Sequence, residues 1–150
     1  MNELQLLNDF VINHFESENL VNTITTVSTI NIDANKENIY PLVNIDFIKK
    51  TTLDDAIVGR YKLTVLSQRD IQPKKTNSKL QTDTNYWDNL NETSAIITKF
   101  INDLVRLHNP ENITIDNITD ENPLKNWGAS GCDGFQFEFD LSIHNKQKDL

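Results

Sequence analysis

The residues of this chain that could do chemistry gather most densely in one glycine-rich stretch, Trp127-Gly128-Ala129-Ser130-Gly131-Cys132-Asp133-Gly134. Such loops can bind phosphate, because their backbone N–H groups approach the phosphate oxygens closely. A phosphate loop would need Lys-Ser or Lys-Thr after its last glycine and then a helix, whereas a strand pattern begins at Phe135. We therefore predict a flexible turn that leads into the last strand.

Cys132 is the single cysteine and could act as a nucleophile only beside a histidine that lowers its pKa. The adjacent carboxylate of Asp133 would instead raise the thiol pKa, so we expect an inert thiol. One cysteine allows no disulfide within the chain. This favours a reducing compartment, or at least folding that does not depend on oxidation.

Metal ligands are scattered along the chain. His14, His108 and His144 form no paired spacing, and no cysteine pair exists for a structural zinc site. The stretch Asp116-Asn117-Ile118-Thr119-Asp120-Glu121-Asn122 is acidic, but it lacks the glycine and the terminal glutamate of a calcium loop. We expect no metal and no cofactor.

A nuclease would place acidic residues and a lysine on a hairpin strand. Asp46 and Lys49 have part of this pattern, but Phe47 stands two positions before the lysine, where a second acid is needed. The sequence thus contains no complete catalytic constellation, and we predict a protein that is not an enzyme and has no catalytic residues.

Composition and charge bear on the remaining classes. The net charge is −8 and the longest lysine cluster is Lys74-Lys75, which argues against binding nucleic acid by phosphate neutralisation. An acidic surface could still line a passage for DNA. The first 20 residues lack the apolar block of a signal peptide, and no run approaches the roughly 20 apolar residues of a membrane span. The hydrophobic content of 37% predicts a thin core, part of whose surface neighbouring subunits could cover.

The element that must organise the chain is a hairpin from Leu42 to Leu66. Apolar and polar residues alternate on both sides of a polar turn at 51–56, which is typical of two antiparallel strands. A similar alternation predicts a strand from Phe135 to Ile143, with three phenylalanines on one face. Two further strands are predicted at 21–32 and 113–118.

Apolar residues at three- and four-residue steps predict amphipathic helices at 2–18, with Asn2 as N-cap, and at 86–108, with Thr84 as N-cap. The predicted order is α-β-β-β-α-β-β in a single domain over 1–150. We expect an α+β fold, in which two helices pack on one face of a mostly antiparallel sheet. The other face carries polar residues and is expected to be wet or to lie against another subunit: Asn44, Asp46, Lys62, Thr64, Glu138 and Asp140.

A polar segment at 67–85 separates the hairpin from the second helix. Loops of this length are usually functional or disordered, so it is either a solvated loop or an arm that becomes ordered against a neighbouring subunit. The tail from 144 is polar and expected to be frayed. Candidate subunit-interface residues lie mainly in and beside the segment: Arg69, Gln72, Lys74, Lys75, Lys79, Tyr86, Trp87 and Trp127.

Several of these features together resemble the phage tail-terminator, or tail-completion, family. They are the leading helix, the strand with Tyr40-Pro41-Leu42-Val43-Asn44-Ile45, the long hairpin with Gly59-Arg60-Tyr61, the polar loop and the Phe-rich closing strand. A related connector ring of a short-tailed phage fits equally well. The resemblance spans nearly the whole chain and rests on element order more than on a motif.

The resemblance implies a non-enzymatic virion protein, made in the host cytoplasm, that forms a ring, usually six-fold, at the head-proximal end of a tail. Such a ring stops growth of the tail tube and joins the tail to the head connector, and genomic DNA passes through it without specific binding. The alternative is a monomeric cellular binding domain that grips a ligand or peptide with Trp127 and the loop 128–134.

Overall fold

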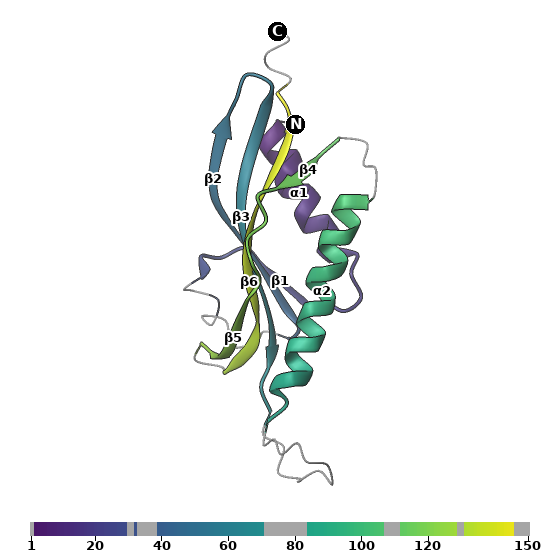
Figure 1. Cartoon of the computed structure of the whole chain (residues 1–150), viewed down its shortest axis with the longest axis vertical. Helices are drawn as coiled ribbons and strands as arrows, with labels where there is room; N and C mark the ends of the chain where they lie inside the picture. Colours follow the sequence, from purple (N-terminus) through teal and green to yellow (C-terminus); the bar gives the residue numbers. More distant parts are fainter. Residues whose placement is uncertain are drawn as a thin grey trace.

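The computed structural model describes residues 2–29, 32, 39–70, 84–106, 112–128 and 131–145. These residues form an α+β fold in which two helices lie beside a six-stranded mixed sheet (Figure 1). The sheet has the order β1-β2-β3-β6-β4, and β5 pairs with β6 below β4. Every pairing is antiparallel except that of β1 with β2, which confirms a mostly antiparallel sheet.

The predicted hairpin is the centre of the sheet. β2 (Leu42–Thr52) and β3 (Ala56–Gln68) pair over nearly their full lengths, and β6 (Cys132–His144) pairs with the whole of β3. A bulge between Phe47 and Lys49 interrupts the alternation of β2, and the Phe47 side chain is 41% exposed rather than buried with its predicted neighbours.

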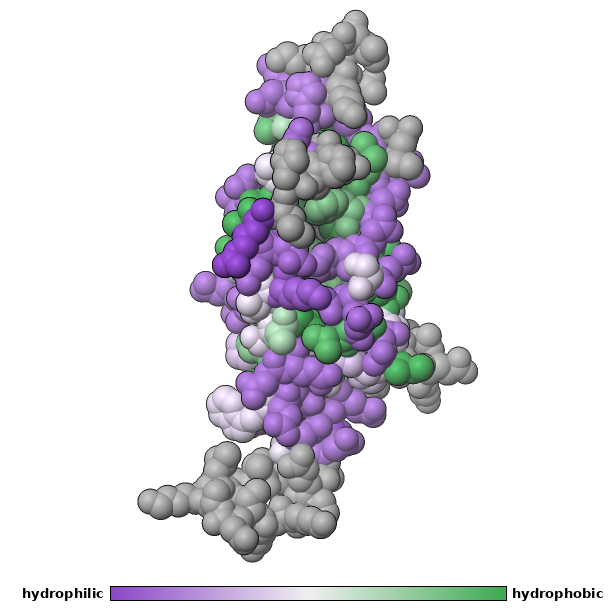
Figure 2. All heavy atoms as spheres, turned by 90° about the vertical axis from the view of Figure 1, so that its right-hand side faces the viewer, coloured by the Kyte–Doolittle hydropathy of each residue, from purple (hydrophilic) through white to green (hydrophobic). Residues whose placement is uncertain are grey.

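Both helices pack on the same face of the sheet, which confirms this part of the expected fold (Figure 1). α1 (Glu3–Glu16) begins at its predicted N-cap, because the Asn2 side chain accepts a hydrogen bond from Gln5 N at 2.8 Å. α2 (Tyr86–Arg106) contributes the longer apolar stripe. The largest fully buried side chains of this core are Tyr61, Phe15, Phe100, Phe137 and Phe139. Seen from the helix side, the surface is mostly hydrophilic with scattered apolar patches (Figure 2).

The edges of the sheet differ from the predicted order. β1 (Thr23–Thr25) is much shorter than the strand expected at 21–32, and β4 (Thr114–Asp116) is shorter than that expected at 113–118. β5 (Asn122–Trp127) is an additional strand that lies on the same edge of β6 as β4. The sequence did not predict β5, because its residues are mostly polar and include Pro123. An edge strand needs little burial, and it tolerates proline where no partner strand requires the N–H group.

The sheet face opposite the helices is not uniformly wet, which corrects the expectation for Asn44 and Thr64. Both side chains are 0% exposed. The segment that follows β1 crosses this face at Asn44, and Thr64 lies between its strand partners Asn44 and Gln136, accepting a hydrogen bond from Gln136 at 3.0 Å. Asn44 donates a hydrogen bond to Val27 O at 3.1 Å, and the Asp46 carboxylate accepts two from Thr29. Below this crossing lies a second small core that contains Ile32, Leu42, Leu66 and Cys132.

The glycine-rich stretch is a turn only in part, which is a second correction: of its described residues, Gly128 and Gly131 lie in a turn, whereas Trp127 and 132–134 lie in strands. Cys132, Asp133 and Gly134 already belong to β6 and pair with the end of β3. A Cβ atom on Gly134 would stand 1.8 Å from the backbone oxygen of Val65, so only glycine fits where the two strands approach. At the far end of β6, Asn145 donates hydrogen bonds to the backbone oxygens of Leu53 and Asp55. The chain is therefore tied to the hairpin turn at 145, and 146–150 lie outside the described residues.

Candidate functional site

The residues on either side of 71–83, a stretch that lies outside the described residues, are hydrogen-bonded to each other. This junction of 68–70 with 85–89 is the root. Asn85 N donates to Asp70 O at 3.1 Å, and Asp70 N donates to the Asn85 side-chain oxygen at 2.6 Å. The Asn85 amide also reaches Gln68 O at 3.3 Å. These bonds join the end of β3 to the start of α2, so each of these two chain ends is held by the other.

A buried ion pair holds the root against the β5–β6 hairpin. The Arg69 guanidinium donates to the Asp133 carboxylate, with an Nη2–Oδ1 distance of 2.7 Å and an Nε–Oδ1 distance of 3.2 Å. The Asp133 side chain is 0% exposed and that of Arg69 is 17% exposed. Such paired, multiply bonded charges are among the strongest polar contacts in proteins.

Asp133 stays ionised in this buried position because its neighbours are all donors. Burial by itself raises its pKa, but hydrogen bonds from Arg69, the Asn126 backbone and the Asn89 side chain outweigh it, so that the pKa is lower than usual. Asn89, on the first turn of α2, donates to the carboxylate at 3.0 Å and to Gln68 O at 3.1 Å. One carboxylate of β6 therefore connects α2, β5 and the residue that follows β3.

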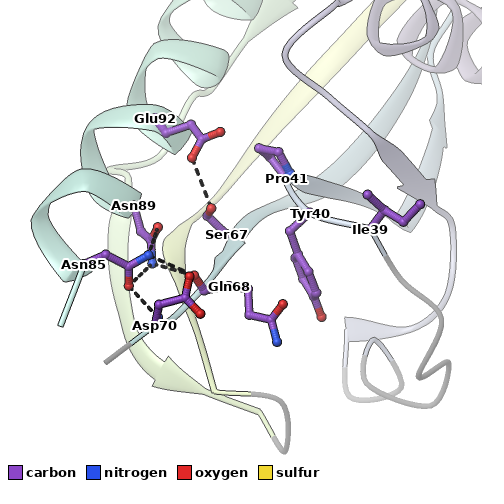
Figure 3. A pocket seen from close by; sticks show the side chains of 9 residues that line it. All are labelled: Ile39, Tyr40, Pro41, Ser67, Gln68, Asp70, Asn85, Asn89 and Glu92. Atoms are coloured by element: carbon purple, nitrogen blue, oxygen red, sulfur yellow. Dashed lines mark hydrogen bonds between the residues drawn. The ribbon is translucent and has the colours of Figure 1, made fainter. Parts of the chain in front are cut away.

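A shallow groove of about 480 Å³ opens beside this network (Figure 3). One wall carries Asn85, just before α2, with Asn89 and Glu92 of α2, and Tyr40 and Ile39 stand across from them. Ser67 donates a hydrogen bond to the Glu92 carboxylate at 3.1 Å, between the two walls. Its lining offers hydrogen-bond donors and acceptors rather than an apolar cavity.

Two aromatic side chains flank the root. The Tyr86 ring contacts two cations, with Arg69 Cζ 5.6 Å and Lys125 Nζ 5.1 Å from its centroid. Trp87 is 60% exposed, although its ring meets that of Tyr86 edge-on. Trp87 therefore leaves part of its aromatic surface open to solvent at the root.

The eight predicted interface candidates fall into three groups. Tyr86 and Trp87 lie at the root, and Arg69 lies there too, but its charge is paired within the chain. Trp127 is only partly exposed and packs against the second small core, at the end of β5. Gln72, Lys74, Lys75 and Lys79 lie outside the described residues.

Sequence reasoning missed the residues that build the root, Asn85, Asn89 and Asp133. Asn85 and Asn89 stand one helical turn apart, which is the only local signal that they act together. The sequence pattern places Asp133 in a loop, because the alternation of apolar and polar residues in β6 begins only at Phe135. Its partner Arg69 is 64 positions away, so no spacing rule connects them.

Across the described part of the chain, the His, Cys, Asp and Glu side chains form no group of three or more that could hold a metal ion. No helix in the described ranges is long and apolar enough to cross a membrane. The charges at the root serve to connect elements, and the arrangement can hold a segment or a partner in place.

Comparison with known proteins adds no relative to this picture: no family model matches the chain, and no curated protein matches it.

Proposed function

We propose that the chain is a structural subunit of a ring at the head-proximal end of a phage tail or in the neck. The ring terminates the tail and joins it to the head, and DNA passes through it. The proposal rests on the resemblance to tail-terminator proteins. An α+β fold with a mostly antiparallel sheet, a long central hairpin and a Phe-rich closing strand agrees with that resemblance.

The observation that carries the proposal most directly is the closed root of 71–83. Asp70 and Asn85, on either side of 71–83, are hydrogen-bonded to each other, and the adjacent Arg69 is paired with buried Asp133. The exposed Trp87 ring lies two residues beyond Asn85. A fixed root lets a long polar segment reach a neighbouring subunit from a defined position. In this role Tyr86 and Trp87 contact the neighbour where the segment leaves the fold.

The partners follow from the same role. They are further copies of the chain, six in the familiar form of such rings, together with tail-tube and neck or connector proteins. The net charge of −8 suits a passage through which DNA moves without adhering, because like charges repel. The protein is then a component of the virion, made in the host cytoplasm, and it needs no cofactor.

The test is quantitative mass spectrometry of purified virus particles, with copies of this chain counted per portal ring. A small ring-like number supports the proposal. Complete absence from intact particles would discard it and favour a cellular binding domain that uses Trp127 and the turn after it. Ligand-dependent fluorescence that disappears in Trp127→Ala would then be the positive sign of that alternative.

Limited proteolysis tests the arm itself. The segment 67–85 should be cut readily in the free protein and resist cutting in the assembly, since contact with a neighbour would order it. Equal cutting in both states would contradict the arm.

A further inference from the structure

The two edges of the sheet are open at the same level. β1 pairs with the outer edge of β2 only as far as Asn44, and from Asp46 to Thr52 the only described strand that pairs with β2 is β3, on its inner edge. On the opposite edge, β4 pairs only with β6 among the described strands. Open edges present unpaired backbone N–H and C=O groups, which a strand from another chain can bind.

The register places four charged residues in one row across the sheet. Lys49 of β2 pairs with Arg60 of β3, Arg60 with Asp140 of β6, and Asp140 with Asp116 of β4. Because cross-strand partners share a face, all four side chains lie on the face opposite the helices. The row thus has two cations at the β2 edge and two carboxylates at the β4 edge.

Within one chain the outer members of this row are poorly matched. The inner two pair well, since Arg60 Nη1 lies 3.0 Å from Asp140 Oδ1. Lys49 then stands beside Arg60, and Asp116 beside Asp140, although like charges directly opposite one another destabilise a sheet. Both outer side chains are exposed, and no ion pair of either is formed within the described residues.

The strand directions allow the two edges to meet. β2 is antiparallel to β3, β3 to β6, and β6 to β4, so β2 and β4 run in opposite directions. Two copies set side by side in the same orientation therefore bring β4 of one against β2 of the next as an antiparallel pair. When the two copies are not shifted along the strand direction, Asp116 of one copy lies opposite Lys49 of the next. The row then continues across both sheets, two cations alternating with two carboxylates.

We propose that copies of this chain associate edge to edge, with the β4 edge of one against the β2 edge of the next, and that Asp116 and Lys49 form the intersubunit ion pair. The contact is heterologous, and a contact of this kind closes into a ring when its rotation allows. It rests on the proposed ring function and names the surfaces that would build it.

Disulfide trapping tests the contact. A chain with both Lys49→Cys and Asp116→Cys should form a ladder of covalent oligomers under mild oxidation, whereas a mixture of the two single variants should stop at dimers. The native Cys132 is buried and does not compete. The control pair is Asp54→Cys with Asp116→Cys, because Asp54 is equally exposed but lies in the hairpin turn. If the Lys49→Cys, Asp116→Cys pair forms covalent oligomers no faster than the control pair, the proposal is overturned. Lys49 would then serve to prevent edge-to-edge pairing of β2.

Charge exchange gives a second test. Lys49→Glu or Asp116→Lys alone should weaken self-association about tenfold or more, since like charges then meet, and the double exchange should restore it. Lys50→Glu is the matched control, with the same charge change on the other face of β2. Equal loss in the control, or no rescue in the double variant, overturns the assignment.

The two proposals fail separately. A ring-like copy number in virus particles without trapping at the edges would retain the ring and discard this interface. Edge-to-edge trapping of a chain that is absent from virus particles would retain the interface and discard the phage role.

Discussion

Replacing Asp133 by asparagine should destabilise the fold strongly, although the side chain keeps its size. The variant removes the charge that faces Arg69 and turns an amide N–H₂ group toward the donors of Asn89 and Asn126. Removing one partner of a buried ion pair typically costs about 3–5 kcal/mol. Because the Arg69 side chain is 17% exposed and can turn toward water, we expect the lower end of that range, about 3 kcal/mol.

Urea unfolding followed by circular dichroism measures this loss, with Asp120→Asn as the control on an exposed aspartate. In a thermal scan a loss of about 3 kcal/mol should lower Tm by roughly 6–12 °C for a chain of this size. A loss below about 1 kcal/mol, the range of an exposed pair, would refute the view that Asp133 joins the root.

A double-mutant cycle with Arg69→Met separates the ion pair from the amide contacts. If the charge pair carries the effect, the two substitutions should be coupled by about 1 kcal/mol or more, within the range for contacting residues. A large loss in Asp133→Asn without coupling would instead assign the stability to Asn89 and the Asn126 backbone. Acid should act in the same direction, because the lowered pKa of Asp133 gives stability that is lost as pH falls through that pKa.

Three further predictions concern the fold. Burial lowers the pKa of His14 from 6.5 despite nearby carboxylates, so at acidic pH the unfolded chain binds more protons than the folded one. The free energy of unfolding should therefore decrease as the pH is lowered from about 6.5. His14→Gln should remove this pH dependence in urea titrations at several pH values. Gly134→Ala should cost more than the usual 1–3 kcal/mol of overpacking, roughly 3 or more, because its Cβ would overlap the backbone of β3. Gly59→Ala meets only a tyrosine ring at 2.9 Å and should be milder in the same melts. Phe139→Ala should cost about 3–5 kcal/mol through a core cavity, and exposed Val105→Ala less than about 0.5 in the same assay.

The root and the open edges divide the proposed assembly into two kinds of contact. The row of four charges would determine how the sheets of neighbouring copies align, because the register of the strands determines which charges meet. The root would fix where the polar segment and Trp87 reach the neighbour. Variants at Lys49 and Trp87 therefore test separate surfaces of the proposed ring.

The local periodicity of the sequence alone determined the two helices, the central hairpin and the Phe-rich strand. Each of these elements buries one face of its own residues, and a period of two or 3.6 records that burial directly in the order of residue types. The N-cap at Asn2 follows in the same way, because its bond reaches only three residues along the chain.

Only the tertiary structure decided the rest, because it depends on which distant residues meet. Asn44 looks solvent-facing by pattern and is buried by a segment that crosses it, and Thr64 is buried between its neighbours on adjacent strands. β5 forms a strand because it pairs with the edge of β6, and Arg69 forms its ion pair with Asp133, which is 64 positions away in the sequence. The row of four charges also depends on the tertiary structure. Its residues are far apart in the sequence, and only the register of the strands brings them into one line.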